Sequence, residues 1–339
     1  MADSGAKPRR SRLSDVARLA GVSTMTVVRV LRDPDKVAAK TRTRVEAVIR
    51  KTDYTPDLMA RALASNRSGI VAVVVPVLTN SLIAEIVQGL TDGLAEGGLQ
   101  LLAGASGFSA EQEEALVRTF LSRRVEAVYL SGTSRTPGTR SLLRAAGIPV
   151  VEGGNLPTRP IDMVVGFSNI EAAAMATRHL IERGQGPIGY IGAHPKDNDR
   201  ARDRRLGFEK AMAGAGIPVV PDLCVETTLD ILGGGRAMAT LLERRPGVRG
   251  VFISADAMAV GALFECQRRG IDVPGKVAIV GFDDLDIAGQ LVPALTTIRV
   301  PRYAIGREAA RVIRERLAGR SVERKIIDLG FELVTRHSA

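Results

Sequence analysis

The stretch LSDVARLAGVSTMTVVRVLRD, residues 13–33, decides the fold of the first part of the chain. Its apolar residues keep helical spacing on both sides of Gly21-Val22-Ser23, which breaks the pattern. Ser23 is a good N-cap for the second segment, and a glycine permits a tight turn. Two short helices around such a turn are predicted to form a helix-turn-helix.

Further helices are predicted directly after this pair. A third helix follows Asp33-Pro34-Asp35, with Thr41 as its expected cap, and ends near residue 52. Tyr54-Thr55-Pro56 interrupts the pattern, and a short helical stretch is expected from Asp57 to Ala64.

The positive charge of the chain is concentrated near its N-terminus. The whole sequence has 47 Lys+Arg and 37 Asp+Glu, a formal net charge of +10. Residues 1–69 contain 15 and 7, a net of +8, whereas residues 70–339 contain 32 and 30. Because Lys and Arg release condensed counterions when they neutralise phosphates, this segment favours a polyanionic partner such as nucleic acid. A solvated basic tail is the alternative that charge alone leaves open.

Composition argues against several other classes of protein. A chain of 339 residues with 45% hydrophobic and 25% charged residues predicts a globular protein of two or three domains. The longest apolar runs, such as residues 70–78, are far shorter than the ~20 residues of a membrane span, and residues 1–12 lack the apolar core of a signal peptide. Only Cys224 and Cys266 are present, which fits a reducing cytoplasm and argues against a Cys-rich zinc site. Neither a cofactor nor a metal is expected.

From residue 70 onward the sequence alternates between strand and helix patterns. The run IVAVVVPV, residues 70–77, is apolar throughout, as in a strand covered on both faces. A second series of strands and helices begins with PIGYIGA, residues 187–193. Such alternation predicts an α/β fold with two doubly wound parallel sheets. Because ligands of such sheets bind beyond the carboxyl ends of the strands, the expected ligand site is a cleft between two lobes.

Several segments carry a resemblance to a known family. Residues 13–65 resemble the DNA-binding headpiece and hinge of the LacI/GalR family of transcriptional regulators. The resemblance continues, in the family's order and spacing, through HLIERG (179–184), RRLGF (204–208), DAMAVGAL (256–263), VAIVGFDD (277–284) and PALTTI (293–298). Within the family, STMTVVRVLRDP, SAEQEEALVR and FDDLDIA are most similar to the LacI-type repressors of gluconate operons.

The resemblance implies a domain organisation. Residues 1–55 are expected to form an all-α helix-turn-helix headpiece and residues 56–68 a hinge helix with its linker. Residues 69–339 are expected to form a two-lobed, periplasmic-binding-protein-like domain for effector binding and dimerisation. Its first lobe is expected at about 69–168 plus 299–326, and its second at about 169–298 plus 327–339.

The resemblance also implies a function. Such a protein is a repressor that binds a pseudo-palindromic double-stranded DNA operator as a homodimer, under the control of a small sugar or sugar acid in the cleft. Gluconate is the expected effector. A regulator of another carbohydrate and a corepressor-dependent regulator are the alternatives, with a sugar-binding protein or enzyme carrying an incidental DNA-binding domain as a more remote one.

The family's second helix lies in the major groove, which points to particular residues for DNA binding. Thr24, Met25 and Arg29 are expected to face base edges, and an arginine can bridge a guanine through two hydrogen bonds. The candidates for phosphate contacts are Ser23, Thr26 and Arg44. Leu63 matches the leucine that wedges between base steps in the minor groove. A solvated Arg29 and simple packing between helices for Leu63 are the alternatives.

Two positions in this region depart from the family pattern. Val28 stands where the family usually has Ser, so one phosphate-binding hydroxyl is missing. Asp57 replaces the more common Asn at the start of the hinge helix, where it is an equally good cap but is repelled by phosphates.

The resemblance places the effector-binding residues at strand ends. Arg204, in the R-x-x-G-F pattern, is expected to hold a carboxylate, and Asp283 to accept hydrogen bonds from hydroxyl groups. Asn80 and Ser81 would close the site from the first lobe. Asp256 is expected to be structural, as the cap of the following helix. Two positions depart from the family pattern: Ala255 stands where Asn is frequent, and Gly154 stands where an acidic residue is frequent. Glu152 or Asn155 could supply the missing polar contacts, or could be plain loop residues.

No motif for catalysis is present in the sequence. The histidines at 179, 194 and 337 lie outside any G-x-S-x-G or H-E-x-x-H context, and Gly233-Gly234-Gly235 lacks the lysine of a phosphate-binding loop. An enzyme is therefore not expected.

Overall fold

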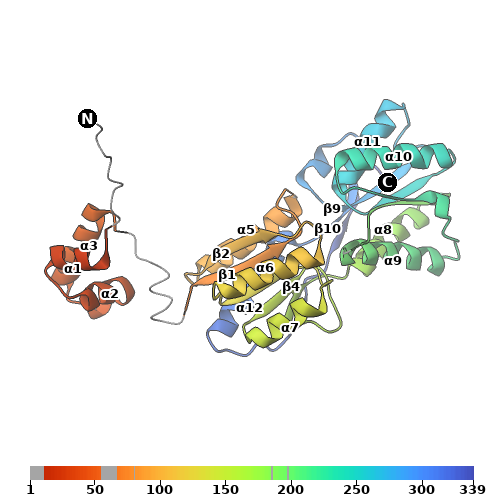
Figure 1. Cartoon of the computed structure of the whole chain (residues 1–339). Coiled ribbons are helices and arrows are strands. Elements are labelled where there is room, and N and C mark those ends of the chain that lie inside the picture. Colours follow the sequence, from red (N-terminus) through yellow and green to blue (C-terminus); the bar gives the residue numbers. More distant parts are fainter. Residues whose placement is uncertain (1–10, 55–66, 80, 185, 197) are drawn as a thin grey trace, which may run out of the picture. The chain divides into compact units, whose positions relative to one another are not determined.

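The computed structural model describes residues 11–54, 67–79, 81–184, 186–196 and 198–339. The chain divides into two compact units between Ser68 and Gly69 (Figure 1). The stretch expected to form the hinge helix, with Asp57 and Leu63, lies outside the described residues.

The first unit is built from three helices, as the hydrophobic pattern predicts. Helix α1 spans Leu13–Ala20, α2 spans Thr24–Arg32 and α3 spans Ala39–Thr52, with a 3-10 turn at Pro34–Lys36 before α3. Gly21, between α1 and α2, has φ +62°, a left-handed conformation that favours glycine. The inner faces meet in a core of Val16, Ala17, Ala20, Val27, Val30 and Val45. The predicted helix-turn-helix is confirmed.

The two expected helix caps in this unit have different outcomes. The Oγ atom of Ser23 caps α2 by accepting a hydrogen bond from the backbone N–H of Thr26 at 3.1 Å. The expected cap of α3 at Thr41 is wrong, because α3 begins at Ala39 and the N–H of Thr41 already donates to the carbonyl of Ala38. The N-cap is Ala38, with φ −53° and ψ +132°, and it makes no side-chain hydrogen bond, so backbone hydrogen bonding and not a side-chain cap marks the start of α3.

The second unit contains two six-stranded sheets, each at the centre of one lobe (Figure 1). The first sheet has the order β11-β5-β4-β3-β1-β2 and is parallel throughout. Its strands are β1 (Ile70–Val75), β2 (Gln100–Ala105), β3 (Ala127–Ser131), β4 (Val150–Gly153), β5 (Met163–Gly166) and β11 (Ile326–Asp328). One face is covered by α5 (Ser81–Ala95) and α12 (Arg302–Leu317), the other by α6 (Ala110–Ser122) and α7 (Pro137–Ala146).

The sheet of the second lobe has the order β12-β10-β9-β8-β6-β7. Its strands are β6 (Ile188–Ala193), β7 (Cys224–Thr227), β8 (Gly250–Ile253), β9 (Ala278–Asp283), β10 (Thr296–Arg299) and β12 (Glu332–Val334). Only the pairing of β12 with β10 is antiparallel among the described strands. One face carries α8 (Asn169–Glu182) and α9 (Asp199–Gly214), the other α10 (Ile231–Arg244) and α11 (Asp256–Arg268). The predicted pair of doubly wound sheets is confirmed.

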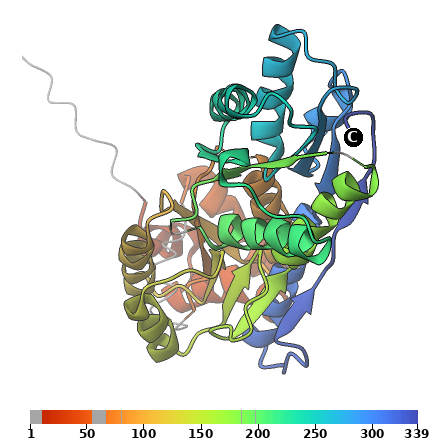
Figure 2. The same ribbon diagram turned by 90° about the vertical axis from the view of Figure 1, so that its right-hand side faces the viewer.

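The chain crosses between the lobes after β5, after β10 and after β11. In Figure 2 the later crossings, coloured blue, run along one side of the two lobes. The expected change of lobe between residues 326 and 327 falls inside β11, which pairs with β5. The third crossing therefore follows Asp328, because strand pairing with the first sheet continues to that residue.

Helices on each sheet face approach one another closely through glycines. A Cβ atom on Gly306 of α12 would collide with the carbonyl oxygen of Ile86 on α5, and one on Gly234 of α10 would collide with that of Met258 on α11. The largest buried cluster extends through both lobes. None of the described helices is long and apolar enough to span a membrane.

Candidate functional site

A cleft lies between the two lobes at the carboxyl ends of strands from both sheets. It encloses about 500 Å³, part of which is open to solvent. In the first lobe, the cleft is lined by the segments that follow β1 and β2 and by the start of α5. In the second lobe, it is lined by the segments that follow β6, β7 and β8, by the end of β9 and by the start of α9. This is the location predicted from the alternating strand and helix pattern.

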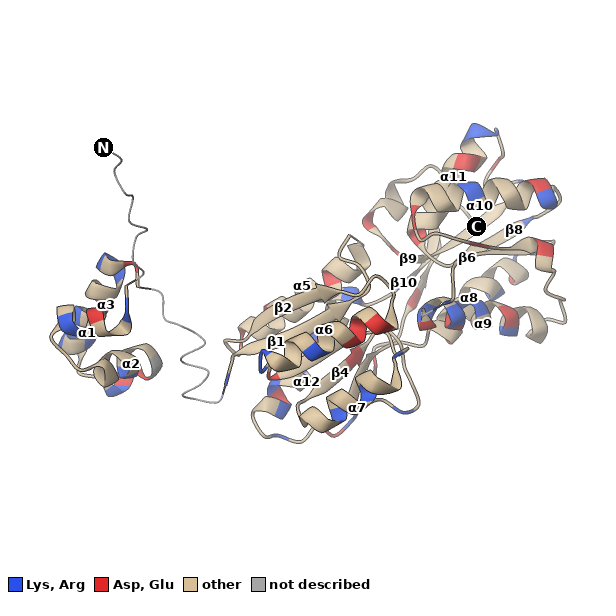
Figure 3. Cartoon of the chain, in the orientation of Figure 1, with Lys and Arg blue, Asp and Glu red and all other residues tan. Residues whose placement is uncertain are grey.

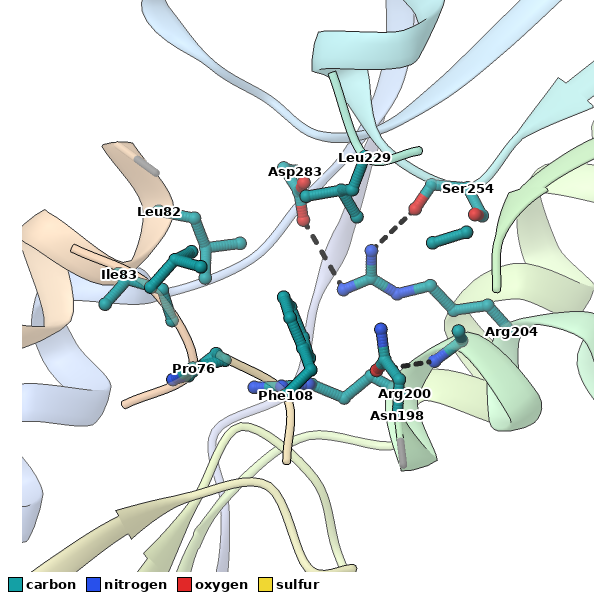
Figure 4. A pocket seen from close by; sticks show the side chains of 13 residues that line it. Pro76, Leu82, Ile83, Phe108, Asn198, Arg200, Arg204, Leu229, Ser254 and Asp283 are labelled. Carbon is teal, nitrogen blue, oxygen red and sulfur yellow. Dashed lines mark hydrogen bonds and ion pairs between the residues drawn. The ribbon is translucent and has the colours of Figure 1, made fainter. Parts of the chain in front are cut away.

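The two walls of the cleft differ in polarity (Figure 4). The first lobe contributes Pro76, Val77, Leu82, Ile83 and Phe108. The second lobe contributes Asn198, Arg200, Arg204, Ser254 and Asp283, together with Ala193, Ala201 and Leu229. The cleft therefore offers one polar wall and one mainly apolar wall.

Helix α9 carries Arg204 into the cleft. Gly207 follows Arg204 by three residues on α9 and lies close to the backbone of Ile170 on α8. A Cβ atom on Gly207 would collide with the carbonyl oxygen of Ile170. Phe208 is completely buried in the main core. The R-x-x-G-F pattern thus seats one face of α9 on α8 and leaves Arg204 at the cleft.

The guanidinium of Arg204 is held in one orientation by four neighbours, of which Figure 4 shows Ser254 and Asp283. Its Nε donates to Oδ1 of Asn169 at 2.9 Å, and its Nη1 donates to the carbonyl oxygen of Ser254 at 2.6 Å. Its Nη2 lies 3.5 Å from Oδ1 of Asp283, and its Cζ lies 3.7 Å from the ring centroid of Phe282. Burial lowers the pKa of Arg204, and the negative charge of Asp283 partly offsets this decrease.

Asp283 ends β9 with φ +120°, an unusual backbone conformation for a residue with a side chain. Burial raises its pKa to about 7, an increase that the cation of Arg204 opposes and the carboxyl of Asp256 reinforces. Its carboxyl group can therefore exchange a proton near neutral pH, as donor or acceptor toward a ligand.

Asp256 is buried, but it does not cap α11 as expected. The N-cap of α11 is Ala255, which makes no side-chain cap. Oδ1 of Asp256 accepts from Oγ1 of Thr297 at 2.7 Å, and Oδ2 accepts from the N–H of Leu285 at 2.9 Å. Burial raises its pKa to about 6. Asp256 thus holds the segment after β9, because its carboxylate points to that segment rather than to its own helix.

Of the two residues expected from the first lobe, Asn80 and Ser81, only Ser81 can be compared with the cleft wall. Asn80 lies outside the described residues. Ser81 is exposed at the start of α5 and is absent from the lining, whereas the next two residues, Leu82 and Ile83, line it. The helical turn directs these apolar side chains into the cleft.

Glu152 and Asn155 also lie outside the lining. Glu152 is buried and accepts hydrogen bonds from Nε of Arg135 at 3.2 Å and from the N–H of Ile161 at 2.7 Å. Asn155 donates from Nδ2 to Asp199 at 3.0 Å. Both side chains are used in contacts within the protein, so they do not replace the family's cleft residues at this wall.

Most lining residues were not singled out by the sequence, among them Phe108, Asn198 and Arg200. Phe108 follows β2 with φ +60°, Asn198 caps α9 by accepting from the N–H of Ala201 at 3.2 Å, and Arg200 is the second residue of α9. The run KDND at residues 196–199 carries a cap signal that could have located the start of α9. The sequence does not reveal that this helix end faces the cleft.

The first turn of α9 ties the two lobes together. Oδ2 of Asp199 accepts hydrogen bonds from the N–H and the Oγ1 of Thr133 at 2.9 and 2.7 Å. Nη1 of Arg200 donates to Oγ of Ser131, at the end of β3, at 2.7 Å. Although burial acts to raise it, the pKa of Asp199 is lowered by Arg200 and by hydrogen bonds from Asn155 and Thr133. The same helix end therefore lines the cleft and joins the lobes.

The first unit presents the expected face of α2 to solvent. Thr24 and Arg29 are exposed, and the residues Met25 and Val28 are 65% and 38% exposed, while Val27 is buried. Figure 3 shows Lys and Arg on α1, α2 and α3, and Arg44 is exposed on α3.

Ser23 and Thr26 are hydrogen-bonded to each other through their hydroxyl groups at 2.9 Å. Each hydroxyl keeps capacity for a further hydrogen bond, because a hydroxyl both donates and accepts.

Comparison with known proteins gives a consistent assignment. Residues 12–57 match the family model of bacterial regulatory proteins, lacI family, and residues 177–339 match the periplasmic binding protein-like domain. The HTH-type transcriptional regulator GntR of Pseudomonas aeruginosa is 38% identical, covering 97% of this chain and 96% of the relative. GntR of Escherichia coli is 35% identical over 96% and 98%, and the HTH-type transcriptional repressor CytR of Escherichia coli is 34% identical over 96% and 95%.

Solved structures agree with this assignment. A LacI family transcriptional regulator from Silicibacter pomeroyi has a TM-score of 0.90 and 32% identity over 97% of this chain and 99% of that chain. The lac repressor dimer bound to operator has a TM-score of 0.87 at 24% identity, a likeness of fold.

The headpiece and the two-lobed cleft define a DNA-binding transcriptional regulator, not an enzyme. The chain belongs to the LacI family of bacterial regulatory proteins, which confirms the resemblance noted in its sequence.

Proposed function

We propose that this regulator is a cytoplasmic repressor that binds its operator as a homodimer and responds to a sugar acid, with gluconate as the best candidate. The observation that carries the effector class is the polar wall of the cleft, where the described lining residues include Arg200 and Arg204 and one carboxyl group, that of Asp283. Relatives named GntR support gluconate.

The DNA contacts follow from the exposed face of α2. Thr24, Met25 and Arg29 would meet base edges in the major groove, with Met25 offering apolar contact and Arg29 two hydrogen bonds to a guanine. Ser23, Thr26 and Arg44 would contact phosphates and set the register. In a dimer the two copies of α2 would read the two halves of a pseudo-palindromic site, and Leu63 would wedge into the minor groove between them.

The effector would act through the two lobes. A polyhydroxy acid would place its hydroxyl groups against Asp283 and Asn198 and its carboxylate against a guanidinium of the same wall, with Asn80 and Ser81 near the opening. It changes operator affinity only if it binds one lobe arrangement more tightly than the other. Release of DNA by the effector is the expected direction.

The experiment begins with duplexes selected from a random pool by the full-length protein. Mobility shifts of the selected site at about 50 and 200 mM salt, with and without gluconate, then test the proposal. We expect site-specific binding with a steep salt dependence and its loss on addition of gluconate. No selected site would contradict the repressor, tighter binding with gluconate would indicate a corepressor, and no response would refute gluconate as effector.

The thermal stability of the protein provides a second readout for the effector. Bound ligand stabilises the folded state by mass action, so gluconate should raise the melting temperature in a concentration-dependent way. A shift given by another sugar or sugar acid, and not by gluconate, would reassign the effector within the same site.

A further inference from the structure

Arg200 occupies a distinctive place in the cleft. It follows the first residue of α9, lines the cleft, and has a side chain that is 14% exposed. Its Nη1 donates to the neutral hydroxyl of Ser131 in the first lobe at 2.7 Å. Arg200 is thus a cation of the second lobe that reaches across the cleft to an uncharged partner.

The other cation of the cleft is already compensated. Arg204 faces Asp283, stacks on Phe282, and donates to Asn169 and Ser254. These contacts occupy all three nitrogens of the guanidinium. A carboxylate would have to compete with a buried acid for this cation.

Two glycines of the first lobe place no side chain of their own against Arg200. A Cβ atom on Gly154 would lie 3.9 Å from both Cδ and Nη1 of Arg200, and one on Gly132 would lie 3.7 Å from its Cζ. An acidic residue at position 154 would meet the guanidinium, whereas a Cβ atom at position 132 would first meet Oδ1 of Asp199, at 2.8 Å. Both glycines have positive φ, +82° and +83°, a conformation that disfavours other residues.

The acid that forms an ion pair with Arg200, Asp199, is turned toward other donors. Oδ1 of Asp199 lies 4.0 Å from Nε of Arg200, at the outer limit of an ion pair. Oδ2 of Asp199 accepts from Thr133 and Asn155. Asp199 therefore serves the lobe contact and does not cover the end of the Arg200 side chain that carries Nη1.

We propose that Arg200 is the residue that selects an acid over a neutral sugar derivative, by binding the carboxylate of the effector through its guanidinium in place of the hydroxyl of Ser131. This rests on the sugar-acid effector proposed above and specifies how that site recognises it. The exchange is favourable because a hydrogen bond between two charged groups is stronger than one to a neutral hydroxyl. The exchange also replaces the contact of Arg200 with Ser131, which joins the two lobes, by a contact to the ligand. Ligand binding therefore removes one hydrogen bond between the lobes.

Calorimetric titration of the full-length protein with gluconate and with gluconamide, its uncharged analogue, tests this proposal. Wild type should prefer gluconate, and Arg200→Gln should lose about tenfold or more in gluconate affinity while its gluconamide affinity stays within about twofold. The preference for the acid should therefore largely disappear. Arg200→Lys keeps the positive charge and should retain part of the preference for gluconate. This variant replaces Arg200→Gln in the test if the glutamine variant does not fold.

Arg202→Gln is the matched control. Arg202 lies on the same helix and also contacts the first lobe, at Ser134, but it does not line the cleft. Its variant should keep the full preference for gluconate, and Ser131→Ala should bind gluconate at least as tightly as wild type.

Other outcomes would overturn the proposal in distinguishable ways. An Arg200→Gln protein that folds and still prefers gluconate, an equal loss in Arg202→Gln, or weaker gluconate binding by Ser131→Ala would each refute the role of Arg200. Wild type that binds neither compound would refute the sugar-acid effector itself, and the selection step with it.

Discussion

Arg204 and Asp283 pair with each other inside the cleft, with Nη2 of the arginine 3.5 Å from Oδ1 of the aspartate. Helix α9 supplies one partner and the end of β9 the other, so the second lobe holds this pair without help from the first. The pair is buried, and a buried ion pair must be satisfied on both sides to be tolerated. The cleft therefore presents an internally compensated group beside a less compensated one, Arg200.

Asp283→Asn should flatten the pH dependence of the free energy of unfolding between about pH 4 and pH 7. The pKa of Asp283 rises from 3.8 to about 7 on folding, so in this range the folded state binds a proton that the unfolded chain has released. The stabilisation is complete at low pH and is lost as the pH rises toward 7. Urea unfolding at a series of pH values measures the effect.

The control for this prediction is Asp286→Asn, a few residues further along the chain and exposed. It should leave the slope unchanged. Asp256, with a pKa raised to about 6, should supply a remaining slope of the same sign. An Asp283→Asn protein with the full wild-type slope would contradict the assignment.

Arg204→Met should destabilise the protein by about 3 kcal/mol near pH 8, because it leaves a buried carboxylate without its cation. Adding Asp283→Asn should recover about half of that loss, since the uncharged amide needs no counterion. Denaturant unfolding of the four proteins in this cycle measures the coupling. If the double variant loses the sum of the two single-variant losses in free energy of unfolding, the interaction between Arg204 and Asp283 contributes nothing to stability.

Arg29→Ala should relax base preference at one position in each half-site, with a loss of about 1–3 kcal/mol on the preferred operator. Arg44→Ala is the contrasting variant, because a lost phosphate contact should weaken all sequences alike and reduce the salt slope by about one. Competition binding over single-base operator variants separates the two patterns. An unchanged preference in Arg29→Ala would exclude it as a reader of bases.

Gly306→Ala should destabilise the first lobe by about 1–3 kcal/mol, because the added Cβ would collide with the backbone of Ile86 and force α12 away from α5. Gly214→Ala, at the end of α9, meets nothing within 4 Å and should be neutral or stabilising by about 0.5–1 kcal/mol. Thermal melting of both variants checks the prediction. Equal effects would mean that the close approach of α5 and α12 is not required.

Part of the candidate site could be predicted from the sequence. Arg204 and Asp283 stand in segments whose pattern marks them, and both line the cleft. The sequence did not identify Phe108, Asn198 and Arg200 as cleft residues, because each follows a strand or starts a helix as many other residues of the chain do. The expected cap role of Asp256 failed for a related reason, since its hydrogen-bond partners come from residues far along the chain.

The sequence by itself determined the helix-turn-helix, the two series of strands and helices, the edge at which the cleft lies, and the family. These follow from spacing and alternation, which are local properties of the chain. Only the tertiary structure decided which guanidinium of the cleft is fully compensated by an acid and which is less so. Arg204 meets an acid 79 positions away in the sequence, whereas Arg200 donates to the hydroxyl of Ser131, 69 positions away. Burial and pairing of charges depend on which distant segments fold together, and that is where the chemistry of this cleft is set.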